Sequence, residues 1–270
     1  MWLEAWPEVT PHNQPLGQSS LQIMAQTSSG KNCYFCGAPA SSREHVPPKC
    51  LFPAQKYLQP GENFRDPLVT VPSCPTHNEA KSADDEHLLH MLILNIANNS
   101  TAQNYFTMGV IKSLQTNKTL LKKLSDSAEP VVAVNTDTGV VDHTFAVDID
   151  HSKIVSSLLH LAYGLHYAHT GNRWMGGVQV DPEFMLNSLD PVTALSANSR
   201  VAQITALADT LFANEPFHGN HQQVFKYQVL TGHQIAPVVM RLHFYEGARV
   251  FLAFRRDIRH GAVATACNDG

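Results

Sequence analysis

Apolar residues along the chain follow helical spacing in some stretches and strand spacing in others. Helical spacing predicts helices over 79–98, over roughly 102–125, over 152–169 with a stop at Gly171, and around 201–211. Strands are predicted at 68–71, on both sides of a turn at 135–139, and at 224–230, 238–244 and 250–254. Together these elements predict an α+β fold that ends in antiparallel strands.

The N-terminal third of the sequence has a different character. The first 30 residues are rich in Pro, Gln, Ser and Thr and show no periodicity, which predicts a disordered or loosely ordered extension. The next stretch, 31–78, is rich in prolines and turns and cannot build a large core. This favours a small module whose fold is stabilised by a bound metal. The predicted organisation is an extension at 1–30, a zinc-bearing module with its helix at 31–100, a helical connector at 101–129 and an α+β domain of unknown role at 130–270.

Composition and charge narrow the class of protein. The 270 residues allow one or two domains, and no apolar run approaches the ~18–20 residues that a membrane span needs. The opening residues lack the basic start and apolar stretch of a secretory signal, so a cytoplasmic protein is expected. The net charge of −4 excludes a global positive field that would attract nucleic acid, but residues 31–81 carry six basic against four acidic side chains.

The cysteines are bunched, with four of the five between positions 33 and 74. Cys33 and Cys36 form one knuckle of the type C-x2-C, and Cys74 and His77 form a second of the type C-x2-H. Zinc prefers four nitrogen or sulfur ligands in a tetrahedron, and each knuckle supplies two. An odd number of cysteines without an export signal favours such a site over a disulfide framework. The two remaining cysteines, Cys50 and Cys267, have no paired knuckle and are interpreted as plain apolar thiols.

Residues suited to hydrolysis accompany the two knuckles. Glu44 and His45 lie between them, and Asn78 directly follows the second. A carboxylate and an amide oxygen can hold Mg²⁺ or a similar ion, and a neutral imidazole can take a proton from water.

This ordered set resembles the HNH endonucleases of the ββα-metal (His-Me finger) fold, in particular a zinc-bearing bacterial branch. The residues that carry the resemblance are Cys33, Cys36, Glu44, His45, Cys74, His77 and Asn78, and the likeness covers about 31–86. It implies a structural zinc on the three cysteines and His77, His45 as the general base, and a catalytic Mg²⁺ or Mn²⁺ on Glu44 and Asn78. The sequence departs from the family pattern at Glu44, where Asp is commoner, and the middle Asn of the family has no assigned residue.

The resemblance implies hydrolysis of DNA phosphodiester bonds, with RNA left open as a substrate. Arg43, Lys49 and Lys81 are candidate contacts for the phosphates. One active site of this kind cuts one strand, so double-strand cleavage would need a homodimer or two encounters. At the level of the family, such a protein fits bacterial defence, restriction or a mobile element, and a complex with a defence-system partner protein is a further expectation.

Alternatives remain open at several residues. His45 could join the zinc ligands, which would leave a non-catalytic zinc knuckle that binds nucleic acid or a partner, with a C-terminal sensing or docking domain. The pairs His87/His90 and His166/His169 have a metal-binding spacing but no evident carboxylate beside them, so packed or solvated histidines are favoured. Asp84, Asp85 and Glu86 are interpreted as the negative charge that stabilises a helix N-terminus.

Overall fold

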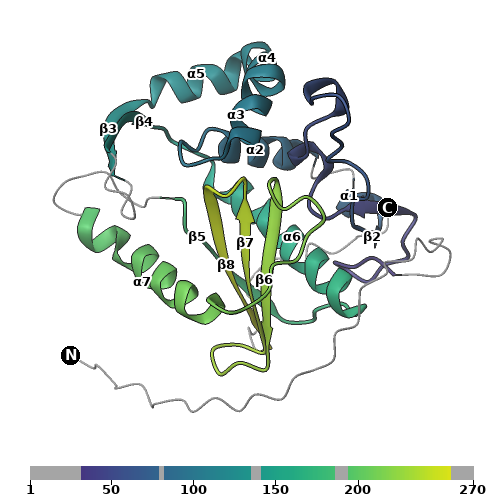
Figure 1. Cartoon of the computed structure of the whole chain (residues 1–270). Helices are drawn as coiled ribbons and strands as arrows, with labels where there is room; N and C mark the ends of the chain where they lie inside the picture. The colour runs from purple at the N-terminus through teal and green to yellow at the C-terminus, as the bar shows by residue number, and fades with distance from the viewer. Residues whose placement is uncertain (1–31, 79–81, 135–140, 186–193, 257–270) are drawn as a thin grey trace.

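The computed structural model describes residues 32–78, 82–134, 141–185 and 194–256. The predicted extension at 1–30, Lys81, the turn at 135–139 and Cys267 lie outside the described residues. Figure 1 shows a twisted four-stranded sheet with helices on both faces, further helices above its upper end, and the N-terminal strand pair to its right.

The N-terminal part is built on one antiparallel strand pair. Strand β1 (Ser42–His45) pairs with β2 (Thr70–Ser73), so that Glu44 lies opposite Val71. The loop between them contains two short 3₁₀ turns, Lys49–Leu51 and Gln55–Tyr57. Helix α1 (Pro75–Asn78) and helix α2 (Ser82–Ile93) follow β2. The strand predicted at 68–71 therefore begins two residues later, whereas β1 and α1 were not predicted.

The helix predicted over 102–125 is divided into shorter pieces. These are α3 (Ser100–Tyr105), a π-helical turn (Phe106–Val110), α4 (Ile111–Thr116) and α5 (Lys118–Asp126). The break before α5 lies at Asn117, which leaves helical geometry and accepts a hydrogen bond from the Leu120 N–H through its side chain. The asparagine side chain thus accepts the hydrogen bond that a backbone carbonyl would accept in an uninterrupted helix.

A two-stranded ribbon and a long helix come next. The predicted hairpin strands are confirmed as β3 (Glu129–Val134) and β4 (Val141–Ala146). Helix α6 (His151–Thr170) begins at the cap Asp150 and ends at Gly171, whose φ of +72° suits glycine. Its apolar face is buried, as the spacing predicts.

The C-terminal sheet contains β5 (Gly177–Pro182), β6 (Phe225–Thr231), β7 (Val238–Phe244) and β8 (Ala248–Arg255), in the order β5-β8-β7-β6 with antiparallel neighbours. Strand β5 was not predicted. Alternate residues of β7 such as Met240 and Leu242 face α6, while Val239 and neighbours pack against α7 (Ala194–Phe212) on the other face.

One buried cluster joins the N-terminal strand pair, α2, α6 and the inner face of the sheet. The described chain therefore has mixed helices and antiparallel sheets, as expected for the coarse fold class. No described helix has the length and apolarity that a membrane crossing requires. The division into a module, a connector and a C-terminal domain stays a prediction.

Candidate metal centre and adjoining cavity

The two knuckles meet at one point in the structure. Cys33, Cys36, Cys74 and His77 each offer one ligand atom, and these atoms all lie within 4.8 Å of one another. The Cys36 and Cys74 sulfurs are 3.8 Å apart, and His77 Nδ1 lies 3.2 Å from the Cys74 sulfur and 3.9 Å from that of Cys33. A tetrahedral zinc at its usual bond lengths would separate two sulfurs by about 3.8 Å and a sulfur from a nitrogen by about 3.6 Å. These four side chains can therefore hold a metal ion such as zinc.

Backbone hydrogen bonds shape each knuckle. The first turns tightly because the Gly37 N–H donates to the Cys33 carbonyl, with Gly37 at a φ of +81° that favours glycine. The second is the start of α1, where the His77 N–H donates to the Cys74 carbonyl. The Tyr34 N–H donates to the carbonyl of Pro72 in β2, which ties the first knuckle to the strand that leads into the second.

The thiols of the cluster influence one another's ionisation. Burial opposes ionisation of Cys33, but hydrogen bonds from His77 and from backbone N–H groups outweigh it and lower the pKa to about 5. Burial, together with the nearby Cys33 and Cys74 sulfurs, raises the pKa of Cys36 to about 12. One thiolate therefore disfavours the next, and a divalent cation is the species that would stabilise several thiolates together.

A cavity of about 440 Å³ adjoins this centre and brings together the predicted catalytic residues Glu44, His45 and Asn78. It lies between the strand pair, the start of α2 and the helices α3 and α4. His45 thus lies with Glu44 and Asn78 and is not one of the grouped Cys and His ligands of the described chain.

Hydrogen bonds orient two of these side chains. Glu44 is only 4% exposed, and its two carboxylate oxygens accept hydrogen bonds from the Tyr34 hydroxyl at 3.2 Å and the Ser73 hydroxyl at 3.3 Å. Asn78 donates through Nδ2 to Ser42 Oγ at 3.0 Å, which fixes the plane of its amide. Both residues therefore present oxygen ligands from defined positions.

The surroundings of His45 favour its neutral form. Burial first, and then the positive charges of Lys49 and Arg65, lower the pKa of His45 below its ordinary value. Both cations also line the cavity. A general base must be neutral before it accepts a proton, and the lowered pKa favours that form. An anionic substrate would offset the nearby positive charges and so favour proton uptake by the imidazole.

The three candidate phosphate contacts are placed differently. Lys49 lines the cavity. Arg43 does not, since its guanidinium donates to the hydroxyl and the carbonyl of Thr70 on the neighbouring strand. Lys81 lies outside the described residues.

Sequence reasoning missed several residues of the cavity wall. Arg65 comes from the β1–β2 loop, and nothing in its sequence neighbourhood indicates a site. Asp85, Glu86 and His90 come from one face of α2. Their spacing is a helical signal, but from the sequence alone the two acidic residues are equally typical of a helix N-terminus and His90 of a packed or solvated histidine. Cys50, expected to be a plain apolar thiol, also lies on this wall and donates weakly to the Asp85 carbonyl.

Comparison of the chain with protein-family models, curated proteins and solved structures finds no match.

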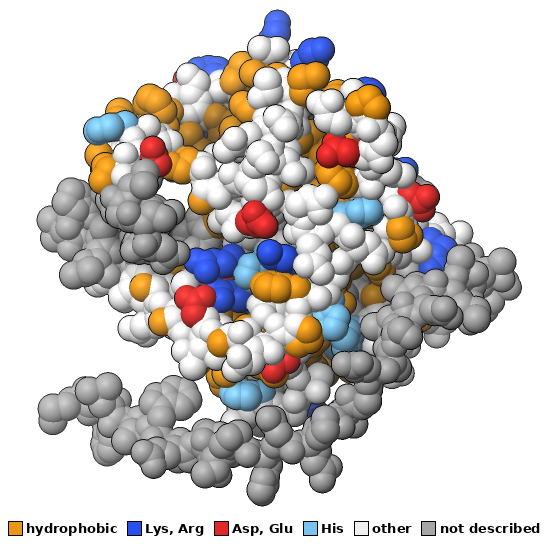
Figure 2. All heavy atoms as spheres, in the orientation of Figure 1, with side chains coloured by type: hydrophobic (Ala, Val, Ile, Leu, Met, Phe, Trp, Pro, Cys, Tyr) orange, Lys and Arg blue, Asp and Glu red, His pale blue; other side chains and the backbone are white. Residues whose placement is uncertain are grey.

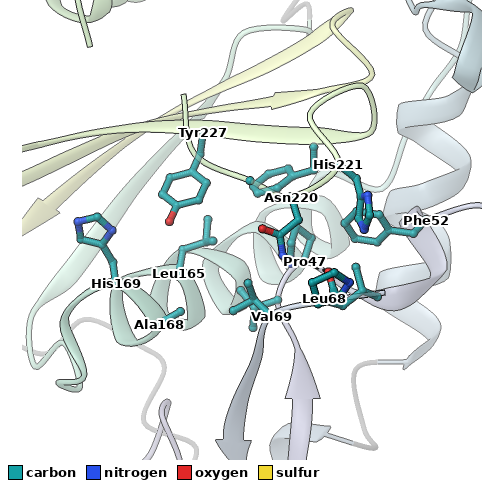
Figure 3. A pocket seen from close by; sticks show the side chains of 14 residues that line it. Pro47, Phe52, Leu68, Val69, Leu165, Ala168, His169, Asn220, His221 and Tyr227 are labelled. Carbon is teal, nitrogen blue, oxygen red and sulfur yellow. Dashed lines mark hydrogen bonds between the residues drawn. The ribbon is translucent and has the colours of Figure 1, made fainter. Parts of the chain in front are cut away.

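A second, apolar cavity of about 50 Å³ lies where the strand pair meets α6 and β6. Figure 3 shows Pro47 and Val69 from the two ends of the β1–β2 loop, Leu165 and His169 from α6, and Tyr227 from β6 around it. His166, on the same helix, is 6% exposed and packs against Trp174 and Phe254, in line with a packed histidine.

Proposed function

We propose that this protein is a metal-dependent endonuclease of the HNH type that hydrolyses DNA phosphodiester bonds. The observation that carries the proposal is the cavity in which Glu44, His45 and Asn78 meet beside a Cys3His group. The chain order of β1, β2 and the helices α1 and α2 is the order that a ββα-metal module would have, which supports the same proposal.

Each of the three residues has a definite task in this mechanism. His45 takes a proton from the attacking water, whose oxygen forms a bond to phosphorus while the bond from phosphorus to the 3′ oxygen breaks. Glu44 and Asn78 would hold the catalytic divalent ion through their oxygens. When bound, that ion would stabilise the negative charge on the phosphate and on the departing oxygen. The Cys3His group would hold a structural zinc that fixes the first knuckle against α1.

The positive charges of the cavity suit this substrate. Lys49 and Arg65 line the same wall as His45, so a bound phosphate would lie in their field. The phosphate would in turn raise the proton affinity of His45 when it binds, which strengthens His45 as a base.

Nicking of supercoiled plasmid by the zinc-loaded protein with Mg²⁺ or Mn²⁺ tests the proposal. A general base contributes about 10²–10⁴-fold to rate, so His45→Ala should lose at least about 100-fold of the nicking rate. The matched control is His143→Ala, at an exposed histidine of β4, which should cut like wild type. Linear DNA, single-stranded DNA and RNA define the substrate class.

Two results would contradict the nuclease assignment. Equal cleavage by His45→Ala and wild type would exclude His45 as the base. Binding of DNA by the wild-type protein, without any metal-dependent cleavage, would favour the alternative of a zinc-knuckle binding protein.

A further inference from the structure

One face of α2 brings a second group of potential ligands into the large cavity. Asp85 lies in the first turn of α2, Glu86 and His90 follow it on the helix, and all three line the cavity. Glu86 and His90 are four residues apart, so their side chains lie on adjacent turns of the same helix face. This supplies the carboxylate that the sequence pattern of His87 and His90 lacked.

His90 carries an unexplained buried nitrogen. The residue is 1% exposed, and its Nε2 atom has no hydrogen-bond partner among the residues that the structure describes. Glu86 Oε1 lies 3.9 Å from this nitrogen, which is too far for a hydrogen bond. Two ligands of one cation, each about 2.0 to 2.2 Å from it, lie about 3 to 4 Å apart. The separation of these two atoms therefore fits a shared cation better than a direct contact.

The carboxylate of Glu86 is held in place from across the cavity. Ser113, on α4, donates from its hydroxyl to Glu86 Oε1 at 2.9 Å. A metal-binding carboxylate is commonly fixed by a hydrogen bond of this kind from a neighbouring residue. The Glu86 side chain is 57% exposed, so an ion can reach it from solvent.

We propose that Glu86 and His90 bind a second divalent cation in this cavity, separate from the ion assigned to Glu44 and Asn78. Imidazole is a good ligand for Zn²⁺ and carboxylate is a good ligand for Mn²⁺, so ions of either kind suit a site with one of each. The site goes beyond the proposed nuclease mechanism, which needs only the ion on Glu44 and Asn78.

Titration of the zinc-loaded full chain with Mn²⁺, followed by the electron paramagnetic resonance signal of the free ion, tests the site. The expected result is two bound Mn²⁺ per wild-type chain and one in Glu86→Gln, a substitution that keeps the shape of an exposed side chain. His90→Ala should also lose one, with circular dichroism checking its fold. Ser113→Ala should weaken the second site by about 10–100-fold.

The matched control is Asp84→Asn, which removes the same charge from the same helix at a residue that does not line the cavity. It should keep both ions. Wild-type binding by both Glu86→Gln and His90→Ala would overturn the proposal.

The variant Glu44→Gln distinguishes the second site from the ion assigned to Glu44 and Asn78. If it loses an ion and Glu86→Gln does not, the second site fails and the nuclease proposal stands. If only Glu86→Gln loses an ion, the second site stands and the ion on Glu44 fails.

Discussion

His243 makes the stability of the C-terminal sheet depend on pH. It lies on β7, where the strand register places Lys226 of β6 on one side and Arg249 of β8 on the other. Figure 2 shows basic side chains gathered with a histidine over this part of the sheet. Burial first, and then the charges of Arg241, Lys226 and Arg249, lower the pKa of His243 to about 3. Asp209 on α7 opposes this shift, but the cations outweigh it.

The consequence for the free energy of unfolding follows from proton uptake. In the unfolded chain the histidine titrates near pH 6.5, so at pH 5 its protonated form exceeds its neutral form about 30-fold. The folded chain keeps His243 neutral at pH 5, because its pKa lies well below that value. Protonation therefore stabilises only the unfolded chain, by RT ln of about 30, or about 2 kcal/mol. This stability is fully present above pH 7.5 and is lost as the pH falls through the unfolded pKa.

Urea unfolding of wild type and His243→Gln at pH 7.5 and pH 5.0 measures this contribution. Between the two pH values, wild type should lose about 2 kcal/mol more than the variant, because glutamine does not titrate. Any cost of the substitution that does not depend on pH cancels in this difference. The control His143→Gln, at an exposed position of β4, should follow wild type. An equal loss in wild type and His243→Gln would refute the reasoning.

Further predictions concern the site and its support. Lys49→Met removes a charge that disfavours the protonated imidazole of His45, so the pKa of His45 should rise and the acid limb of the cleavage profile should move to higher pH. Cys74→Ser should release zinc, measured by metal analysis, and lower the melting temperature. Gly164→Ala should lower the free energy of unfolding, measured in urea, by about 1–2 kcal/mol. The added Cβ would lie 2.7 Å from Val46, and such overpacking costs about 1–3 kcal/mol. This exceeds the gain of about 0.5–1 kcal/mol from replacing glycine by alanine within a helix.

Elements with a strong period are predictable from this sequence. The long helix α6 has apolar residues at helical spacing over five turns and a glycine at its end, and the structure places its limits one residue outside the predicted ones. Strand β7 alternates between residues that face α6 and residues that face α7. In both elements the period of the sequence matches the side that tertiary packing buries.

Elements whose form depends on distant partners are not predictable in this way. Every residue of β5 is half-buried, so the strand carries no alternation of buried and exposed positions. The four residues of β1 are polar, and pairing with β2 makes them a strand. The break at Asn117 arises because its side chain competes for a backbone N–H, which a count of apolar positions does not register.

The same distinction applies to the candidate site. The C-x2-C and C-x2-H spacings predict the Cys3His group, because each knuckle fixes its own two ligands locally. Asp85, Glu86 and His90 become wall residues only because α3 and α4 close the cavity over one face of α2. No local sequence pattern predicts which face of α2 these later helices will cover.

The contacts of α6 indicate how the C-terminal half of the protein supports the Cys3His group and the adjoining cavity. Phe35, inside the first knuckle, stacks on His160 of α6 at 4.4 Å between ring centroids. It also packs at a tilt against the ring of His77 at 4.6 Å. Val46, the residue after His45, packs against Gly164 on the same helix. The strand pair has only four residues in each strand, which is too little to fix side chains on its own. Helix α6 therefore positions both the Cys3His group and the wall that carries His45, and the sheet positions α6.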